Sequence, residues 1–515
     1  MIILVHCKGR EVISISKDEQ LPLNLYSSIP QKAIQELAKQ FPDELLIWVD
    51  RKFEKIINIS NINKIFHHNK IFASYALSGN CFLSQEIAYI DESPFVNINS
   101  SVKYPTWIMS KDIGGIYGEV LNKFEGIYSQ NENFEYFLSS VAKMGMKAGL
   151  MCYSDPSFAH KVNKYSLTFS EDSNVLYHFV KQHYKLRWMA LLILQEKIYQ
   201  KKVHFLSIIK ALCNSQKLKV KTDLKSISLK TKSIIKASKL TVDVIIPTLG
   251  RREYLYQVLK DLNNQTVKPD SVIIIEQNPN QSLKSNPEYL FKENWDFEIV
   301  YKIINQTGAC NARNLAFESV KSDWVFMADD DIGVPREFIA RSKIFIEEYM
   351  PSAFTVSCLQ EGEVEQEQSP IQWKSFGSGC SWVKKEVVNQ VKFDLSFEHG
   401  YGEDADYGMQ LRNKGIDVLY NPHLMLRHIK APIGGFRTKI FQPWEKEKIT
   451  PKPSPTIMAF KIKHSTQYQL MSYKARLFIK YYKQQKIKNP LKYINEMNQR
   501  WNQSKKWAEY LLSQN

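Results

Sequence analysis

The sequence predicts an α/β fold for residues 241–440, preceded by an α+β lobe at residues 1–235 and followed by a basic helical tail at residues 441–515. Two observations predict the central fold. Short apolar runs rich in β-branched residues, typical of buried parallel strands, alternate with segments of helical spacing. Strands and helices that alternate in this way form parallel sheets with right-handed crossovers. The lysine-rich stretch at residues 201–240 comes before them and indicates an exposed linker.

The predicted elements follow one another in a regular order. The run "VDVII" at 242–246 predicts a buried strand, the apolar positions of 255–262 a helix, and "VIII" at 272–275 the next strand. In a further unit, "GACNARNLAFESV" predicts a helix and "DWVFMA" a strand. Polar residues follow three of these strands: Pro247 and Thr248, then Glu276 and Gln277, then Asp329, Asp330 and Asp331. Because ligands of such sheets bind beyond the carboxyl ends of the strands, we expect the three clusters to converge.

Four motifs carry a resemblance to a known family. They are "VDVIIPTLGR", "GACNARN", "ADDD" and "GEDADYGMQLRNKG", in that order. Together they resemble the family-2 glycosyltransferases, inverting and nucleotide-sugar-dependent enzymes of the GT-A fold, over residues 241–436. The resemblance implies an enzyme that moves a sugar from a nucleotide-diphosphate sugar, such as a UDP-sugar, to a hydroxyl of a glycan or lipid-linked acceptor in surface polysaccharide synthesis.

The aspartate triplet needs a positive partner, because adjacent carboxylates repel one another. The resemblance implies Mn²⁺ or Mg²⁺ held by Asp329 and Asp331, with His428 as a third ligand. A divalent cation would absorb the charge of the departing diphosphate. The family often has an aspartate where this chain has Ala328, so the register of the motif is open by one residue. The alternatives are an acidic turn at a strand end and a structural histidine.

The resemblance also implies a set of donor contacts. They are Pro247, Thr248, Arg251, Glu276, Arg313, Asn314, Asp329 and Asp330. Glu276 stands where the family has the shorter aspartate, and Arg313 lies on a helix that begins after Gly308, with its N-terminus toward the diphosphate. A glycine-containing loop at 434–437 is expected to close over the diphosphate. In the alternative, Pro247 only ends its strand, Glu276 is an exposed loop residue and Arg313 makes packing or ion-pair contacts.

A second acidic site lies in "GYGEDADYGMQL". Glycosyl transfer needs a base that takes the proton of the acceptor hydroxyl. By the resemblance Asp404 is this base, and Glu403 orients or binds the acceptor. The alternative is a helix start with acids in its first turn.

Short segments of the first lobe resemble segments of the second. "GLMCYSDP" at 149–156 and "GIDVLYNP" at 415–422 share a glycine-to-proline interval, and each follows a helical segment. An ungapped alignment of these segments places Phe137 and Leu138 opposite Glu403 and Asp404. Further upstream, "LLIWVDRKF" resembles "DWVFMADDDI" and keeps only Asp50 of the acids. We interpret the first lobe as a degenerate, non-catalytic GT-A-like lobe. A generic α+β domain is the alternative.

The net charge of +16 indicates an anionic partner or a solvated lysine surface. The seven scattered cysteines, the lack of a leader and the lack of a long apolar run favour a cytoplasmic protein. From Lys461 onward the tail interleaves basic and apolar residues. We expect it either to lie peripherally on an anionic membrane surface or to pack on the second lobe.

Two other functions use some of the same features. Nucleotidyl or phosphoryl transfer would use the aspartates, but the sequence contains no Walker-type motif. A nucleic-acid-binding protein would use the positive charge, but no nucleic-acid-binding motif is present and the aspartates would repel phosphate. Nucleic acid is therefore not an expected partner.

Overall fold

The computed structural model describes residues 1–17, 21–22, 27–127, 133–160, 167–214, 222–233, 235–279, 288–432 and 441–514. The chain divides into two units. We call Met1–Ser233 with Ser465–Arg476 the first lobe, and Ile234–His464 with Leu477–Asn515 the second lobe. The boundary lies in the lysine-rich stretch, and the C-terminal segment is shared between the lobes instead of forming a unit of its own. The predicted loop at 434–437 lies outside the described residues.

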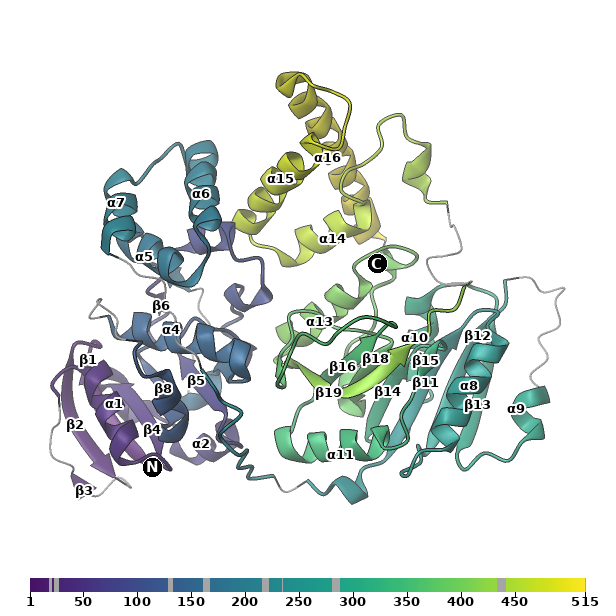
Figure 1. Ribbon diagram of the computed structural model, residues 1–515, viewed down its shortest axis with the longest axis horizontal. Coiled ribbons are helices and arrows are strands. Elements are labelled where there is room, and N and C mark those ends of the chain that lie inside the picture. The colour runs from purple at the N-terminus through teal and green to yellow at the C-terminus, as the bar shows by residue number, and fades with distance from the viewer. Residues whose placement is uncertain are drawn as a thin grey trace. The chain divides into compact units, whose positions relative to one another are not determined.

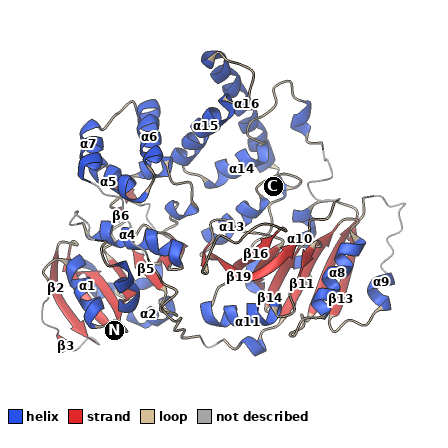
Figure 2. Cartoon of the chain, in the orientation of Figure 1, coloured by secondary structure: helices blue, strands red, loops and turns tan. Residues whose placement is uncertain are grey.

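The second lobe is built on a mixed sheet with a parallel core (Figures 1 and 2). In the described residues its strand order is β13-β12-β11-β14-β18-β16-β19-β15, with β17 paired to β19. The strands are β11 (Val242–Thr248), β12 (Ser271–Gln277), β13 (Glu298–Ile304), β14 (Trp324–Ala328), β15 (Ile332–Gly333), β16 (Ala353–Leu359), β17 (Ile371–Gln372), β18 (Cys380–Lys384) and β19 (Val418–His428). Strands β13, β12, β11 and β14 are parallel, and β18 runs against β14 and β16. The apolar runs predicted β11, β12 and β14 but not β13.

Helices cover both faces of this sheet. They are α8 (Arg252–Asn263), α9 (Glu288–Lys292), α10 (Ala309–Phe317), α11 (Phe338–Tyr349), α12 (Lys385–Gln390) and α13 (Glu403–Asn413). Apolar residues of α10, α12 and α13 form one core with every second residue of β12 and β14. On the other face, Phe338 of α11 packs against Phe326 and Trp382. The alternation of side chains along each strand therefore gives two apolar layers and leaves the carboxyl ends of the strands for polar residues.

Three helices form the C-terminal segment: α14 (Pro455–His464), α15 (Gln467–Tyr482) and α16 (Pro490–Ser513). The buried residues of α16 lie on one stripe, at Tyr493, Met497, Trp501, Ser504 and Ala508. This stripe lies toward α14, and the Ser504 hydroxyl donates to the Pro453 carbonyl at 2.8 Å. The tail helix thus packs on its own lobe, as one of the two sequence-based alternatives states. Within the described residues, each helix is too short or too polar to cross a membrane.

The first lobe is built on a sheet of order β3-β2-β1-β4-β8-β5-β9-β7 in the described residues, with a separate β10-β6 ladder. The strands are β1 (Ile2–Cys7), β2 (Glu11–Lys17), β3 (Leu21–Pro22), β4 (Leu45–Asp50), β5 (Ile71–Tyr75), β6 (Asn80–Cys81), β7 (Tyr104–Pro105), β8 (Ile113–Tyr117), β9 (Met151–Ser154) and β10 (Thr168–Phe169). The helices are α1 (Pro30–Gln40), α2 (Ile59–Ile65), α3 (Gly118–Leu121), α4 (Phe134–Gly145), α5 (Ser173–His183), α6 (Leu186–Gln195) and α7 (Phe205–Asn214). One large core joins α1, α4, α5 and α6 to the sheet.

The two sheets share five consecutive strands. The order β1-β4-β8-β5-β9 in the first lobe corresponds to β11-β14-β18-β16-β19 in the second. Each series has the same four relations between neighbours: parallel, antiparallel, antiparallel and parallel. The sheets differ at one edge, where β2 forms a hairpin with β1 while β12 runs parallel to β11. The expected GT-A-like first lobe is therefore present in its strand order.

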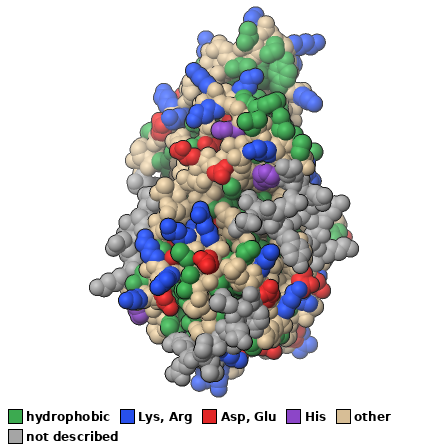
Figure 3. Space-filling model, turned by 90° about the vertical axis from the view of Figure 1, so that its left-hand side faces the viewer, with side chains coloured by type: hydrophobic (Ala, Val, Ile, Leu, Met, Phe, Trp, Pro, Cys, Tyr) green, Lys and Arg blue, Asp and Glu red, His purple; other side chains and the backbone are tan. Residues whose placement is uncertain are grey.

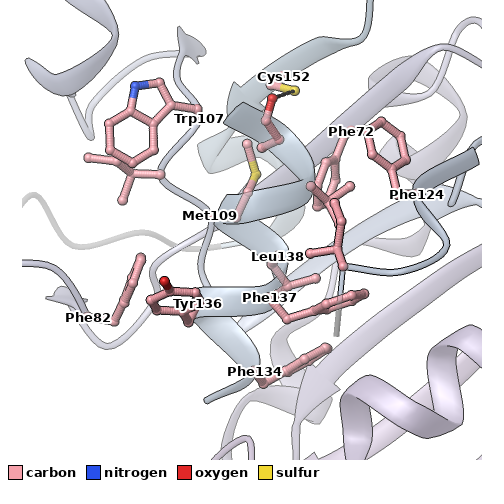
Figure 4. Close-up of a cluster of buried hydrophobic side chains, with 14 of the residues drawn as sticks. Phe72, Phe82, Trp107, Met109, Phe124, Phe134, Tyr136, Phe137, Leu138 and Cys152 are labelled. Atoms are coloured by element: carbon pink, nitrogen blue, oxygen red, sulfur yellow. Dashed lines mark hydrogen bonds between the residues drawn. The ribbon is translucent and has the colours of Figure 1, made fainter. Parts of the chain in front are cut away.

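The residue-level alignment of the lobes differs from the one that the sequence predicted. Phe137 and Leu138 lie in the hydrophobic core around α4 (Figure 4). Helix α4 starts at Phe134 and α13 at Glu403, so the second residue is Glu135 in one helix and Asp404 in the other. The ungapped alignment missed this because it was anchored on the segment after the helix, and α4 with its following turn is longer than α13.

Candidate active site

The polar clusters that follow β11, β12 and β14 converge at one edge of the second sheet. Thr248 and Glu276 are direct partners in the parallel ladder of β11 and β12. The Thr248 hydroxyl donates to Asp330 Oδ2 at 2.7 Å, which joins the first strand end to the aspartate triplet. Glu276 accepts a hydrogen bond from the Tyr301 hydroxyl on β13. Pro247 is buried within β11 beside Ile275.

The positive partner of Asp330 and Asp331 is Arg251. Its Nη1 lies 2.6 Å from Asp330 Oδ1 and 3.2 Å from Asp331 Oδ2. Gly250, at φ +64°, turns the chain so that Arg251 precedes α8 at the strand ends. Burial raises the pKa of Asp330 to about 6, although Arg251 and the Thr248 hydroxyl favour its charged form. This guanidinium therefore relieves much of the repulsion that the sequence indicates.

Asp331 and His428 lie together at the end of β19. The pairing of β15 with β19 sets Ile332 opposite His428, and this brings His428 Nε2 to 3.7 Å from Asp331 Oδ1. The other Asp331 oxygen accepts the Ala431 N–H at 3.0 Å. A carboxylate and an imidazole at this separation fit one divalent cation as a pair of ligands. Among the described residues, no group of three or more potential ligands is arranged around a metal position.

Asp329 contacts a different set of residues from Asp331. Its Oδ1 accepts a hydrogen bond from Arg313 Nη2 at 2.8 Å, and its side chain is 41% exposed. A Cβ atom at Gly379 would lie 2.1 Å from Asp329 Oδ2, so only glycine leaves room for this carboxylate. The Asp329 carboxylate is therefore accessible to a ligand. Its backbone N–H donates a hydrogen bond to the Gly379 carbonyl at 3.2 Å. Its assignment as a metal ligand stays a prediction.

Arg313 connects the triplet to the second acidic site. Its side chain is 6% exposed, and its Nε has no hydrogen-bond partner among the residues that the structure describes. Burial opposes the charge of Arg313, but the charges of Asp329 and Asp404 more than offset this, so the pKa of Arg313 is raised. A buried cation with an unpaired N–H is costly unless a ligand or further charge faces it.

The acid pair begins helix α13. Gly402 precedes it at φ +114°, and Glu403 and Asp404 fill the first two helical positions. The Ser378 N–H donates to Asp404 Oδ1 at 3.1 Å. Burial raises the pKa of Asp404, against the charge of Arg313. Burial and then the charge of Asp404 raise the pKa of Glu403 to about 7. Two carboxyl groups in this state differ from ordinary first-turn acids, which a helix N-terminus would keep ionised.

The N-terminus of α10 is occupied by a side chain that the sequence did not single out. Glu398 accepts the N–H groups of Cys310 at 3.1 Å and Asn311 at 2.8 Å. The helix start after Gly308 therefore faces a carboxylate, contrary to the expectation that it faces the diphosphate. Asn314 exchanges two hydrogen bonds with the Phe393 backbone, each of 2.8 Å, and so holds the loop that leads to Glu398.

Sequence reasoning also missed the group that anchors α13. Asp406 is buried and lies 2.8 Å from Lys463 Nζ and 2.7 Å from His464 Nε2, both on α14. Asp404 and Asp406 are two residues apart on one helix and therefore point to different sides of it. This spacing is a sequence signal that the two aspartates have different roles. Glu398 and Ser378 left no such local signal, because each contact joins residues far apart in the sequence.

Comparison with known proteins gives one family match. Residues 243–393 match the model of glycosyl transferase family 2. None of the curated proteins matches this chain.

Several solved structures are similar to the chain at low identity. S. aureus TarS 1-349 is 15% identical, with 36% of this chain and 60% of that chain covered and a TM-score of 0.28. The same protein in complex with UDP-GlcNAc is 14% identical over 53% of this chain and 84% of that chain, with a TM-score of 0.35. GalNAc-T7 with UDP, GalNAc and Mn²⁺ is 13% identical over 52% of this chain and 56% of that chain, with a TM-score of 0.37.

Proposed function

Residues 243–393 form a family 2 glycosyltransferase domain, as the sequence predicted, and on this premise we propose that the second lobe transfers a sugar from a nucleotide-diphosphate sugar. UDP is the nucleotide that we expect. The acceptor is a hydroxyl of a glycan or of a lipid-linked sugar, in the synthesis of a surface polysaccharide.

The observation that carries the proposal is the buried Arg313. It lies 2.8 Å from Asp329 on the donor side, and its charge also acts on Asp404 and Glu403 on the acceptor side. The two acidic sites therefore share one electrostatic environment. Burial raises the pKa values of both Asp404 and Glu403, and carboxyl groups with shifted pKa values are typical of acid–base sites in enzymes.

Each acidic group has a separate role in the proposed reaction. Asp404 takes the proton of the acceptor hydroxyl as the oxygen attacks the anomeric carbon. The bond from that carbon to the diphosphate oxygen breaks, and its electron pair leaves with the diphosphate. Arg251 and Arg313 offer positive charge where the negative charge grows. Glu403 orients the acceptor.

The donor turn would hold the nucleotide through Pro247, Thr248 and Glu276, which lie together at the strand ends. A bound Mn²⁺ or Mg²⁺ would be held by Asp331 and His428 and would neutralise charge on the diphosphate.

Thermal unfolding of the purified chain tests the nucleotide and metal parts separately from turnover. A ligand that binds only the folded state raises the melting temperature. We expect UDP with Mn²⁺ to raise it more than UDP with a chelator, and Asp331→Asn to remove the difference. Asp50→Asn in the first lobe is the matched control and should keep it. Equal stabilisation by oligonucleotides, or no response to any nucleotide diphosphate, would contradict the proposal.

An anionic membrane surface is a proposed partner of the C-terminal segment. The connection from α15 to α16 and the first turn of α16 expose Lys483, Lys486, Lys488 and Lys492. Leu491 and Ile479, at 79% and 57% exposure, lie in the same segment. Basic residues beside exposed apolar ones favour binding to anionic lipid at about 1 kcal/mol per charge. Flotation with anionic vesicles should therefore carry wild type upward, and replacement of the four lysines by glutamine should leave it at the bottom. Equal flotation of both proteins would reject the partner.

A further inference from the structure

The first lobe has a pocket at the place that corresponds to the acidic site of the second lobe. Lys111 lies two residues before β8, as Ser378 lies two residues before β18. Its N–H is 3.5 Å from Glu135 Oε1, as the Ser378 N–H is 3.1 Å from Asp404 Oδ1. Glu135 and Asp404 are each the second residue of the following helix. The turn after the first strand is also repeated, with Gly9-Arg10 at φ +70° and Gly250-Arg251 at φ +64° for the glycines.

This pocket has a volume of about 330 Å³. Its walls come from the β6–β10 ladder, the start of α4 and the segment that leads into α5. The residues that matter for binding are Lys111, Glu135, Asn133, Ser170, Phe82 and Phe169. Such a volume lies near the lower end of small-molecule sites, about 300–1,000 Å³.

Charge excludes a nucleotide diphosphate from the pocket. The lining contains one lysine and two acids, Glu135 and Asp172. Lys111 Nζ lies 2.8 Å from Glu135 Oε2, and the Glu135 side chain is 7% exposed. The ion pair thus neutralises the lysine, and Asp172 adds a further negative charge to the lining. A diphosphate would meet an excess of negative charge.

The same lining suits hydroxyl groups. A paired lysine and glutamate offer charge-assisted donors and acceptors at fixed positions, and such hydrogen bonds are about twice as strong as neutral ones. Asn80, Thr168 and Ser170 add uncharged polar groups at the rim. Phe82 packs edge-on against Tyr136 (Figure 4), so a rigid aromatic group borders the polar floor. This combination complements a sugar ring: an aromatic side chain can pack on the C–H face of the sugar, and the polar groups can form hydrogen bonds with its hydroxyls.

We propose that this pocket of the first lobe binds a neutral saccharide of one or two rings. The site binds without catalysing transfer, because its carboxylate is held by a lysine. Binding here does not depend on the proposed transferase activity of the second lobe.

Saturation-transfer NMR on the full chain tests the proposal with the methyl glycosides of glucose, galactose and N-acetylglucosamine as probes. We expect at least one glycoside to bind, and excess UDP with Mn²⁺ to leave its signal unchanged. The double variant Lys111→Met with Glu135→Gln should weaken binding at least tenfold. Neutralising both members avoids a lone buried charge.

The matched control removes another buried ion pair of the same lobe. Lys143 Nζ and Asp91 Oδ2 are 2.9 Å apart, and neither residue lines the pocket. Lys143→Met with Asp91→Asn should keep the glycoside signal. Thr168→Trp, at an exposed rim position, should abolish it without touching the ion pair. The proposal is wrong if no glycoside binds the wild type, if UDP competes, or if the control pair and the pocket pair lose binding equally.

Discussion

The two lobes place a carboxylate at the same point of the same strand order, yet the surroundings give it different chemistry. In the first lobe Glu135 forms an ion pair of 2.8 Å with Lys111. In the second lobe Asp404 has a backbone N–H as its hydrogen-bond partner, with Arg313 acting on it at longer range and Glu403 beside it. The Lys111 ammonium favours the charged form of the Glu135 carboxylate and so opposes its uptake of a proton, although burial raises the pKa of Glu135. The difference shows that strand topology fixes where a site lies, and the nearest charge decides what the site can do.

The lobes also differ in how the turn after the first strand is used. Arg10 is exposed, whereas Arg251 lies between Asp330 and Asp331. In the second lobe this arginine thus forms ion pairs with buried aspartates. On the face of the molecule drawn in Figure 3, basic and acidic side chains are interspersed.

The largest expected difference between the lobes comes from this pair of arginines. Arg251→Met removes the cation between two aspartates, so turnover with a nucleotide-sugar should fall on the order of 10²–10³-fold, as for other preorganised charge-stabilising groups. Arg10→Met, at the equivalent turn, should change turnover by less than about twofold. Steady-state kinetics of both variants decides, and equal losses would remove the distinction between the lobes.

The pH dependence of turnover should report the second lobe alone. The pKa of Glu403 is about 7 and that of Asp404 is raised, so protonation of the pair removes the base as pH falls. We expect kcat/KM to be highest above about pH 7 and to fall as the pH is lowered and the pair takes up protons. A profile that stays flat down to pH 5 would show that neither carboxyl group accepts the proton.

Stability should depend on pH through Glu403 with the opposite sign from an ordinary paired acid. Its folded-state pKa is about 7, above the ordinary value of 4.5, so the folded chain holds a proton that the unfolded chain releases. Stability is therefore lost as pH rises from about 4.5 to 7. Glu403→Gln should add roughly 1–2 kcal/mol to the free energy of unfolding above pH 7 and little at pH 4, measured by denaturant titration. A variant less stable than wild type at pH 8 would contradict this environment.

The smallest expected effect on turnover is that of replacing Asp50. This residue is at the end of β4, and β4 corresponds to β14, which the aspartate triplet follows. Asp50 accepts the N–H groups of Lys8 at 2.7 Å and Lys52 at 3.1 Å, and so caps backbone turns. Asp50→Asn should cost about 1 kcal/mol of stability and leave turnover nearly unchanged. Asp329→Asn, in contrast, should abolish most transfer. Loss of turnover in both variants would give the first lobe a catalytic part.

The sequence predicted the features that follow from local pattern. The strands at 242–246, 272–275 and 324–328 lie within β11, β12 and β14, because continuous β-branched runs have few alternatives in an α/β protein. The convergence of Thr248 and Asp330 followed from the rule that parallel strands end at one edge. The similarity of the first lobe to the second was predicted from short segments, and the two sheets share five strands in the same order.

What the sequence did not predict depends on contacts between distant residues. Glu398 caps α10 across 88 positions of the chain, and Asp406 meets His464 across 58. The sequence indicated a metal ion as a positive partner of the triplet, and it did not indicate that two arginines lie against the aspartates. The alignment of Phe137 with Glu403 was off by one helical turn, since an added turn at the start of a helix leaves its end unchanged.

The most direct test of the account is turnover of a UDP-sugar by Asp404→Asn in the full chain. The central claim is that Asp404 is the base of the second lobe and that the first lobe has no transferase activity. We expect turnover to fall by roughly 10²–10⁴-fold, with the affinity for UDP, measured by calorimetry, nearly unchanged. Residual turnover near the wild-type level, or a large loss of UDP affinity with turnover spared, would contradict the claim.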